Sequence, residues 1–256
     1  MFNIRNTLLT FTIFILFIAN SFAQVNIETL RNEKEDKSVS FELGGGAEIK
    51  FGNVDVTKIN TSALVHYFVL DTHLFSKAEY IWGSQNQIDF EESSFLHARA
   101  TKMLNNLFGL EVFTQFQNNK FTSLNLRQLN GLGTRLELYK DKHTVLSLGI
   151  GGMSDYEIVN INNIIKKSLD PRGTSYISFL RSIDDKNTIA ITLYYQPHIL
   201  RPLDYRINVE GLIRLSLIKK LNIFIDNTFN YQRDTNPPKD INVNDFSTNI
   251  KITYKW

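Results

Sequence analysis

Cysteine is absent from the 256 residues of this chain, and proline occurs only 5 times. Without cysteine, the protein can form no disulfide framework, no cysteine-ligated zinc or iron–sulfur site and no thiol nucleophile. An excess of one charge is also missing, because 28 lysines and arginines against 26 aspartates and glutamates leave a formal net charge of +2. So small an excess creates no long-range field that gathers nucleic acid, and we expect no nucleic-acid partner.

Apolar residues are plentiful, at 43% of the chain, and include 19 phenylalanines and 10 tyrosines. A chain this rich in apolar and aromatic residues is not intrinsically disordered. Its mean hydropathy of −0.18 is nevertheless that of a soluble protein. Such an average misleads if apolar and polar residues alternate along strands, because the two faces then cancel.

The first residues have the pattern of an export signal. Arg5 precedes an apolar run, Leu8–Ala19, that is too short to span a bilayer as a helix. The small residues Ser21 and Ala23 then match a signal-peptidase site. We therefore predict that residues 1–23 are a cleaved signal peptide; an uncleaved anchor is the alternative. Residues 24–37 are dense in charge and predict a periplasmic N-terminal tail.

From Ser38 onward, the chain alternates with period two, which is typical of β-strands. Val39, Phe41 and Leu43, for example, alternate with Ser40 and Glu42. The pattern predicts about twelve strands, each roughly long enough to cross a bilayer when tilted. These are Val39–Phe51, Val56–Phe68, Thr72–Gly83, Ser93–Leu104, Phe108–Gln117, Thr122–Tyr139, Thr144–Asp155, Thr174–Ile183, Thr188–Gln196, Tyr205–Leu217, Leu221–Gln232 and Val243–Trp256.

The links between these strands differ in length on the two sides. Every second link is short, whereas most of the others are long, as in outer-membrane barrels with short periplasmic turns and long outer loops. Gly52–Asp55 and Asn118–Phe121 are exceptions, because they are short on the long-loop side. The expected long links are Ser84–Glu92, Tyr156–Gly173, Pro197–Asp204 and Arg233–Asn242.

These patterns predict an all-β protein, in which residues 38–256 form a single transmembrane antiparallel up-and-down β-barrel. A bilayer offers no partner to free backbone groups, so strands span it only when the sheet closes. The apolar side would face lipid and the polar side would line the lumen. The alternative is a soluble secreted β-barrel or sandwich that binds a ligand, because alternation alone does not say which face is inside.

The end of the chain resembles bacterial outer-membrane barrels, whose assembly machinery recognises a final strand that ends in an aromatic residue; here that strand is Ile250–Trp256. The region Phe95–Glu157 resembles the uncharacterised family of salt-induced outer membrane proteins. The residues that carry this second resemblance are Arg127, Leu129–Arg135, Leu146–Gly152 and Glu157. The resemblance implies a location in the cell outer membrane and assigns no chemistry.

Charged residues of both signs follow the parity of the polar face. The strongest lumen-lining candidates are Glu111, Arg127, Arg135, Glu137, Glu210 and Arg214. They would either pair as a structural network, because unpaired buried ions are costly, or line a constriction that conducts or binds a small solute or ion. The sequence does not assign the pairs.

No residue pattern indicates catalysis. The chain has five histidines, but no serine lies in a nucleophile-elbow setting. The glycine stretches Gly44–Gly46 and Gly149–Gly152 precede no helix that could bind phosphate. We expect no cofactor and no metal. The prediction is a non-enzymatic barrel, either a narrow passive pore or a structural envelope protein, in contact with outer-membrane lipids, lipopolysaccharide and the barrel assembly machinery. A lipid-modifying outer-membrane hydrolase is the alternative.

Overall fold

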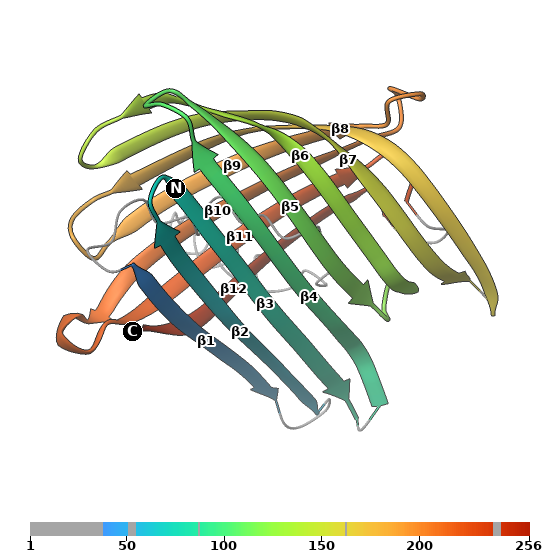
Figure 1. Cartoon of the computed structure of the whole chain (residues 1–256). Coiled ribbons are helices and arrows are strands. Elements are labelled where there is room, and N and C mark those ends of the chain that lie inside the picture. The colour runs from blue at the N-terminus through green and yellow to red at the C-terminus, as the bar shows by residue number, and fades with distance from the viewer. Residues whose placement is uncertain (1–37, 51–54, 87, 162, 238–241) are drawn as a thin grey trace, which may run out of the picture.

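The computed structural model describes residues 38–50, 55–86, 88–161, 163–237 and 242–256. The predicted signal peptide and N-terminal tail lie outside these residues. Figure 1 shows the strands running antiparallel around an all-β barrel, in which sequence neighbours are spatial neighbours and β12 returns to β1. The predicted fold class is confirmed: this is a closed antiparallel barrel of twelve strands. Among the described residues, no helix is long and apolar enough to cross a membrane.

The strands are longer than most of the predicted ranges. They are β1 (Val39–Lys50), β2 (Val56–Val69), β3 (Thr72–Gln85), β4 (Ile88–Met103), β5 (Phe108–Asn119), β6 (Leu124–Lys140), β7 (Thr144–Ile161), β8 (Ile164–Ser182), β9 (Thr188–Pro197), β10 (Tyr205–Ile218), β11 (Ile223–Asp234) and β12 (Asn244–Lys255).

The alternation of the sequence is the alternation of the two barrel faces. In β9, Ala190, Thr192 and Tyr194 are buried, whereas Ile191 and Leu193 are exposed. Large apolar side chains are exposed in this way on strands all around the barrel. A soluble protein would bury such side chains, so the outside of this barrel suits a lipid environment.

A charge on this outer surface should be costly at the middle of a strand. Leu132 lies at the centre of β6 and is 71% exposed on the outside. We expect Leu132→Arg to lower the free energy of unfolding by about 2–4 kcal/mol in a bilayer. Leu104, 52% exposed in the link after β4, is the matched control, and Leu104→Arg should cost about 0–1 kcal/mol. Urea unfolding in lipid vesicles measures both, and equal costs would contradict the assignment of the apolar face to lipid.

At the end of the barrel where β1 begins and β12 finishes, three links share one turn motif. An Asn or Asp side chain accepts hydrogen bonds from the backbone N–H groups two and three residues later, as in an Asx turn. Asn105 accepts them from Leu107 and Phe108 at 2.9 and 2.8 Å. Asp141 and Asp184 make the equivalent bonds in their own links. This motif explains why these links are short.

The Asp141 turn predicts a pH dependence. Hydrogen bonds from the backbone of His143, then from the Tyr139 hydroxyl, lower the pKa of Asp141 to about 2. A depressed carboxyl pKa stabilises the fold above the unfolded-state pKa, and that contribution is lost as the pH falls through the folded-state pKa. We expect NMR titration of Asp141 to give a midpoint near pH 2 and the turn to loosen between about pH 4 and pH 2. An ordinary midpoint near pH 4 would contradict the motif.

At the opposite end, which we call the far end, two predicted long links are wrong. Ser84–Glu92 and Tyr156–Gly173 are largely strand, because β3 and β4 are joined by residues 86–87 and β7 and β8 by residues 162–163. Asn86 and Asn163 adopt φ of 50° and 64°, a left-handed conformation that asparagine tolerates and that permits tight reversal. The long loops after β9 and β11 are confirmed.

Candidate functional site

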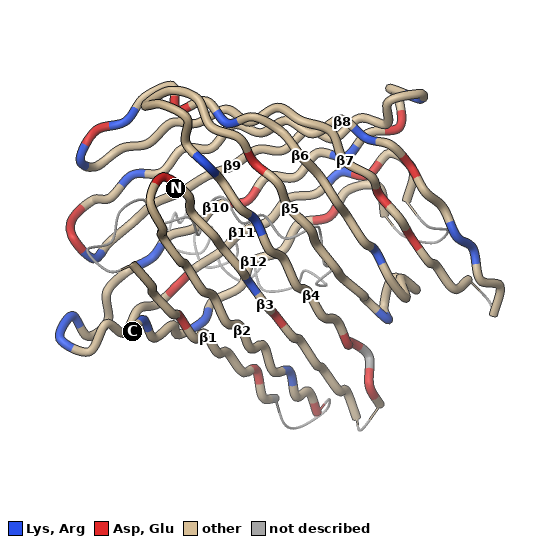
Figure 2. Tube along the Cα trace, viewed as in Figure 1, with Lys and Arg blue, Asp and Glu red and all other residues tan. Residues whose placement is uncertain are grey.

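All six charged candidates are buried, and they belong to different groups inside the barrel. Figure 2 shows charged residues spread along the strands as well as in the turns. Each such residue on a strand costs free energy unless an opposite charge or hydrogen bond compensates it. The sequence did not assign the ion pairs between these residues, and the structure now does.

The first group, the Arg206 network, lies toward the far end. Arg206 on β10 forms ion pairs with Glu157 of β7 at 2.7 Å, with Asp234 of β11 at 2.8 Å and with Asp155 of β7. The candidate Arg127 on β6 joins through Glu157 at 2.6 Å. Because β7 and β10 are not neighbours in the barrel, these contacts cross the lumen.

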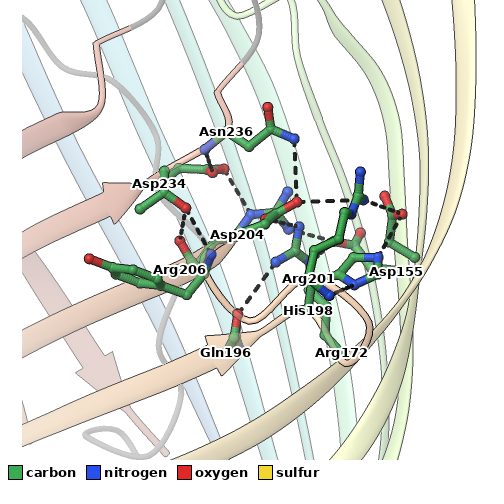
Figure 3. Close-up of polar contacts among 12 residues, drawn as sticks. Asp155, Arg172, Gln196, His198, Arg201, Asp204, Arg206, Asp234 and Asn236 are labelled. Carbon is green, nitrogen blue, oxygen red and sulfur yellow. Dashed lines mark hydrogen bonds and ion pairs between the residues drawn. The ribbon is translucent and has the colours of Figure 1, made fainter.

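The loop between β9 and β10 is tied into this network, as Figure 3 shows. Arg172 pairs with Asp155 at 3.2 Å and with Asp204 of the loop at 3.0 Å. The His198 ring accepts hydrogen bonds from the backbone N–H groups of Leu200 and Arg201. Side chains therefore hold the loop toward the barrel wall. The same ion pairs also connect the far ends of the neighbouring strands.

The second group, the Glu111 network, contains three more candidates. Glu111 accepts a hydrogen bond from the Tyr176 hydroxyl at 2.8 Å and pairs with Arg99 at 3.4 Å. Arg135 donates to the same Tyr176 hydroxyl at 3.1 Å and approaches Glu137 at 3.9 Å. The group links β4, β5, β6 and β8 across the lumen.

The third group lies where the barrel closes. Arg214 of β10 binds Glu42 of β1 at 2.8 Å and Asp226 of β11 at 2.7 Å. Glu210 is 3% exposed and is in register with Thr192 and Asn230 of the flanking strands. Of the six candidates, the structure thus brings Glu111, Arg135 and Glu137 together and places Arg127, Arg214 and Glu210 apart.

An apolar layer, which the sequence did not predict, crosses the lumen. Its buried side chains come from β2, β3 and β4 on one wall and from β9 and β10 on the opposite wall, and the half-buried Leu180 of β8 packs against them. Apolar side chains packed across a narrow lumen exclude water from it. The members of the apolar layer are Leu64, Phe75, Phe95, Leu180, Ala190 and Leu212.

Histidines border the apolar layer on the β2–β4 wall. The His66 ring meets Phe75 edge-on at 5.1 Å and lies 3.0 Å, nitrogen to nitrogen, from His73. His97 stacks on Phe95 at 6.3 Å between ring centres. The wall at this level is therefore aromatic, but it also carries charge, because the Lys77 ammonium lies 5.6 Å from the centre of the Phe95 ring.

On the far side of the apolar layer, the lumen carries amides that lack protein partners. Neither side-chain atom of Asn60 has a hydrogen bond within the described chain, although the residue is only 4% exposed. The side-chain oxygens of Gln196 and Asn230 are likewise buried and unpaired. Buried amides in native proteins are satisfied by protein or water, so the lumen at these positions suits water or a polar solute. We use the name outer chamber for the part of the lumen between the apolar layer and the far end, which these amides line.

A groove of about 640 Å³ lies on the outer surface. Its rim is formed by exposed apolar residues of β2, β3, β5 and β6, such as Tyr67, Leu74 and Leu132. Small residues, among them Ala98 and Ala100, form its floor. The groove therefore belongs to the lipid side of the wall.

Asp155, Glu157, Arg172 and Asp234 are lumen residues that were not among the predicted candidates. Asp155 is the last residue of a predicted strand, and the other three lie in stretches that we expected to be loops. Arg206 has the same parity as Glu210, and that signal could have found it.

Little in the lumen suggests reaction chemistry. Within the described ranges, no three His, Asp or Glu side chains are grouped to hold a metal ion. His97 bonds to Gln115 at 3.1 Å and His198 to Asp170 at 3.2 Å. Neither contact brings a hydroxyl nucleophile to a base.

A family model described as "Protein of unknown function, DUF481" matches residues 43–256, which include nearly the whole barrel. The chain belongs to the DUF481 family. The resemblance to the salt-induced outer membrane proteins is confirmed by this match. A comparison with curated proteins finds no match.

Solved structures share the barrel architecture of this DUF481 protein at low identity. The translocator domain of the autotransporter NalP from Neisseria meningitidis has a TM-score of 0.51 at 8% identity, over 84% of this chain and 87% of that one. The NanC porin gives 0.49 at 13% identity over 85% and 100% of the two chains. The KdgM porin gives 0.46 at 11% identity over 85% and 98%. The NalP likeness concerns the fold alone, and the two porins have lower TM-scores.

Proposed function

We propose that this protein is a non-enzymatic pore of the cell outer membrane, closed at rest by the apolar layer and permeable to small polar solutes when that layer wets. The exposed apolar side chains on the outside of the strands would contact outer-membrane lipids and lipopolysaccharide. Residues 1–23 would direct export, and the aromatic end of β12 would engage the barrel assembly machinery.

The observation that carries this proposal is the position of the apolar layer between polar regions. A barrel that only needed a filled interior could be apolar along its length, without the cost of burying charges. Here the apolar layer lies in a lumen whose other buried residues are mostly polar or charged. Apolar constrictions of this kind gate pores by dewetting.

The unpaired amides of the outer chamber add support. Asn60 lies on β2, four residues from Leu64 of the apolar layer and on its far-end side. An amide without protein partners favours water or a solute hydroxyl at that point. Because the ion pairs leave little net charge to attract an ion, an uncharged polar solute is the favoured cargo.

Planar-bilayer recording tests the pore. We expect the wild type to be silent for most of the time, and Phe95→Ala combined with Leu212→Ala to conduct steadily, because the double change removes apolar volume from both walls of the layer. Ile191→Ala, on the outside of β9, is the control and should remain silent. A double variant that is folded but silent would refute the pore, and a wild type that is constantly open would refute the closed layer.

A structural barrel is the second candidate, favoured by the Arg206 network. Ion pairs that join β7, β8, β10 and β11 brace the lumen from within. The same recordings decide between the two functions, because a structural barrel stays silent after the layer is thinned.

The lipid-modifying hydrolase is a weaker alternative. It would need a hydroxyl nucleophile beside a base at the lipid face, whereas His66 and His97 are buried inside the barrel. Mass spectrometry of lipid A and phospholipids from cells with and without the protein tests it, and a changed lipid would favour the hydrolase over the pore.

A further inference from the structure

The barrel closes through an unusually short ladder between β1 and β12. Register pairs run over four positions, from Glu42↔Lys255 to Gly45↔Ile252. The next shortest ladder, between β8 and β9, runs over eight. Gly46–Lys50 of β1 and Asn244–Lys251 of β12 therefore continue toward the far end without register pairs to each other. We call this stretch the open seam.

Backbone groups point into the open seam from both sides. Phe41 and Trp256 exchange N–H···O bonds of 3.2 and 2.8 Å. The backbone N–H and C=O groups of odd residues of β1 therefore point toward β12, and those of even residues of β12 point toward β1. By the same parity, Ala47 and Ile49 on β1 direct their N–H and C=O groups toward β12. The even residues of β12 from Phe246 to Ile250 do so toward β1. These groups lie beyond the last register pair.

The open seam lies at the depth of membrane lipid. The side chains of Ile49, Phe246 and Ile250 point outward and are 59%, 42% and 65% exposed. An open sheet edge is costly in hydrocarbon, because its free backbone N–H and C=O groups find no hydrogen-bond partner there. Lipid tails cannot supply hydrogen bonds, so the edges need a polar group that reaches them through the wall.

On the lumen side, the open seam begins at glycines. Gly44 and Gly46 occupy lumen-facing positions and place no side chain there. A Cβ on Gly46 would come within 3.2 Å of the Ile250 carbonyl oxygen, so the two backbones are still in contact where the register pairs end. At Gly44 and Gly46, β1 therefore adds no side chain to the lumen wall.

Ion pairs inside the lumen hold the two edges together where the ladder is short. Glu42 of β1 binds Arg214 at 2.8 Å and Lys255 of β12 at 3.5 Å. Lys251 of β12 reaches across β1 and β2 to Glu79 of β3 at 3.6 Å. These side-chain ion pairs can separate without breaking backbone hydrogen bonds between the two strands.

We propose that the open seam is a lateral passage, in which a single-chain amphiphile exchanges between the outer leaflet and the outer chamber. Its polar head would satisfy the seam edges and the chamber amides, while its acyl chain stays in lipid. This goes beyond the pore, and it does not require the apolar layer to open. Leu64 of that layer is in register with Glu42, and the open seam begins four residues further toward the far end, at Gly46.

Because the chain has no cysteine, the seam can be locked reversibly. Ala47→Cys with Ile250→Cys bridges the open seam. Ala47→Cys with Ile59→Cys is the matched control, since Ala47 and Ile59 are register partners in the complete β1–β2 ladder. In both proteins, Asn230→Cys carries a bimane fluorophore inside the chamber, attached after the disulfide has formed.

The probe is a lysophosphatidylcholine with a nitroxide on its headgroup, added to vesicles that contain the labelled protein. We expect weak quenching of bimane while the seam disulfide is closed and a several-fold increase after reduction. The control should be quenched to the same high level before and after reduction, and a water-soluble nitroxide should quench all samples equally. Equal lipid quenching with the seam closed, or none with it open, would overturn the proposal.

Hydrogen exchange gives a second measurement, which does not depend on disulfide formation. We expect the amides of Phe246, Thr248 and Ile250, which point toward β1, to exchange faster than those in Ile223–Phe229 of the neighbouring strand β11. Equal protection would show a complete ladder and overturn the proposal. If the Phe95→Ala, Leu212→Ala variant stayed silent in bilayer recordings while the seam amides exchanged fast, the proposed pore would be rejected and the lateral passage would still be supported.

Discussion

Arg206→Met is expected to lower the free energy of unfolding by about 3–5 kcal/mol, the cost of breaking a buried ion pair on one side. Arg206 is 5% exposed and serves three carboxylates at once, those of Asp155, Glu157 and Asp234. Methionine preserves much of the volume, so the loss is electrostatic. Asp155 is the most affected partner, because it is 1% exposed.

Urea unfolding in vesicles, followed by the fluorescence of Trp82 and Trp256, measures this loss. Arg201→Met is the matched control, because its side chain is 57% exposed while it pairs with Asp170 and Asp204. An exposed pair contributes about 0–1 kcal/mol. If both variants lost equally little, water would already screen the Arg206 network, and the network would not brace the barrel. Asp155→Asn added to Arg206→Met should restore part of the loss by removing one unpaired anion.

The parity of the strands was predictable from the sequence because it depends on one strand at a time. Ile191 and Leu193 alternate with Thr192 and Tyr194 whatever their neighbours are, and a lipid outside makes that alternation strict. The burial of Glu111, Arg127 and Arg135 follows from the same local rule. These side chains could be placed on the polar face without knowledge of the register.

The contacts across the lumen could not be predicted in this way. Arg206 meets Glu157 because β7 and β10 come close through the interior, which depends on the stagger of the strands between them. The apolar layer has the same origin. Leu64 and Leu212 have the parity of polar residues, and in isolation each is an exception to its strand's pattern. Only their meeting inside the barrel shows that the exceptions form one layer.

The extension of β7 and β8 at the far end was not predicted, for a different reason. The described residues between Ile158 and Leu169, which exclude residue 162, are half-buried or exposed without regular alternation. A hairpin that rises past the lipid has water on both faces, so no difference in solvent imposes a period of two. Asn163 supplies the tight reversal, but it could equally have belonged to a loop.

Deleting Tyr254–Trp256 is expected to abolish folding into the membrane. The deletion removes two of the four register pairs between β1 and β12, as well as the bonds between Phe41 and Trp256. The remaining pairs would be Gly44↔Thr253 and Gly45↔Ile252, where glycine gives the strand little packing. With so short a seam the barrel would stay open, and its free edges would face hydrocarbon at several kcal/mol for each unsatisfied group.

The fraction of protein that resists unfolding in cold detergent, measured by its mobility on gels, reports this closure. We expect the truncated chain to give no folded band either in cells or in pure lipid vesicles without assembly proteins. Trp256→Phe is the control and should fold, because it keeps the backbone bonds and an aromatic end. Failure in cells alone would mean that the last residues act as a recognition signal, whereas failure in vesicles as well would mean that they close the barrel. A truncated chain that folds normally in both would show that two glycine pairs suffice, and the short ladder would then no longer set the stability of the seam.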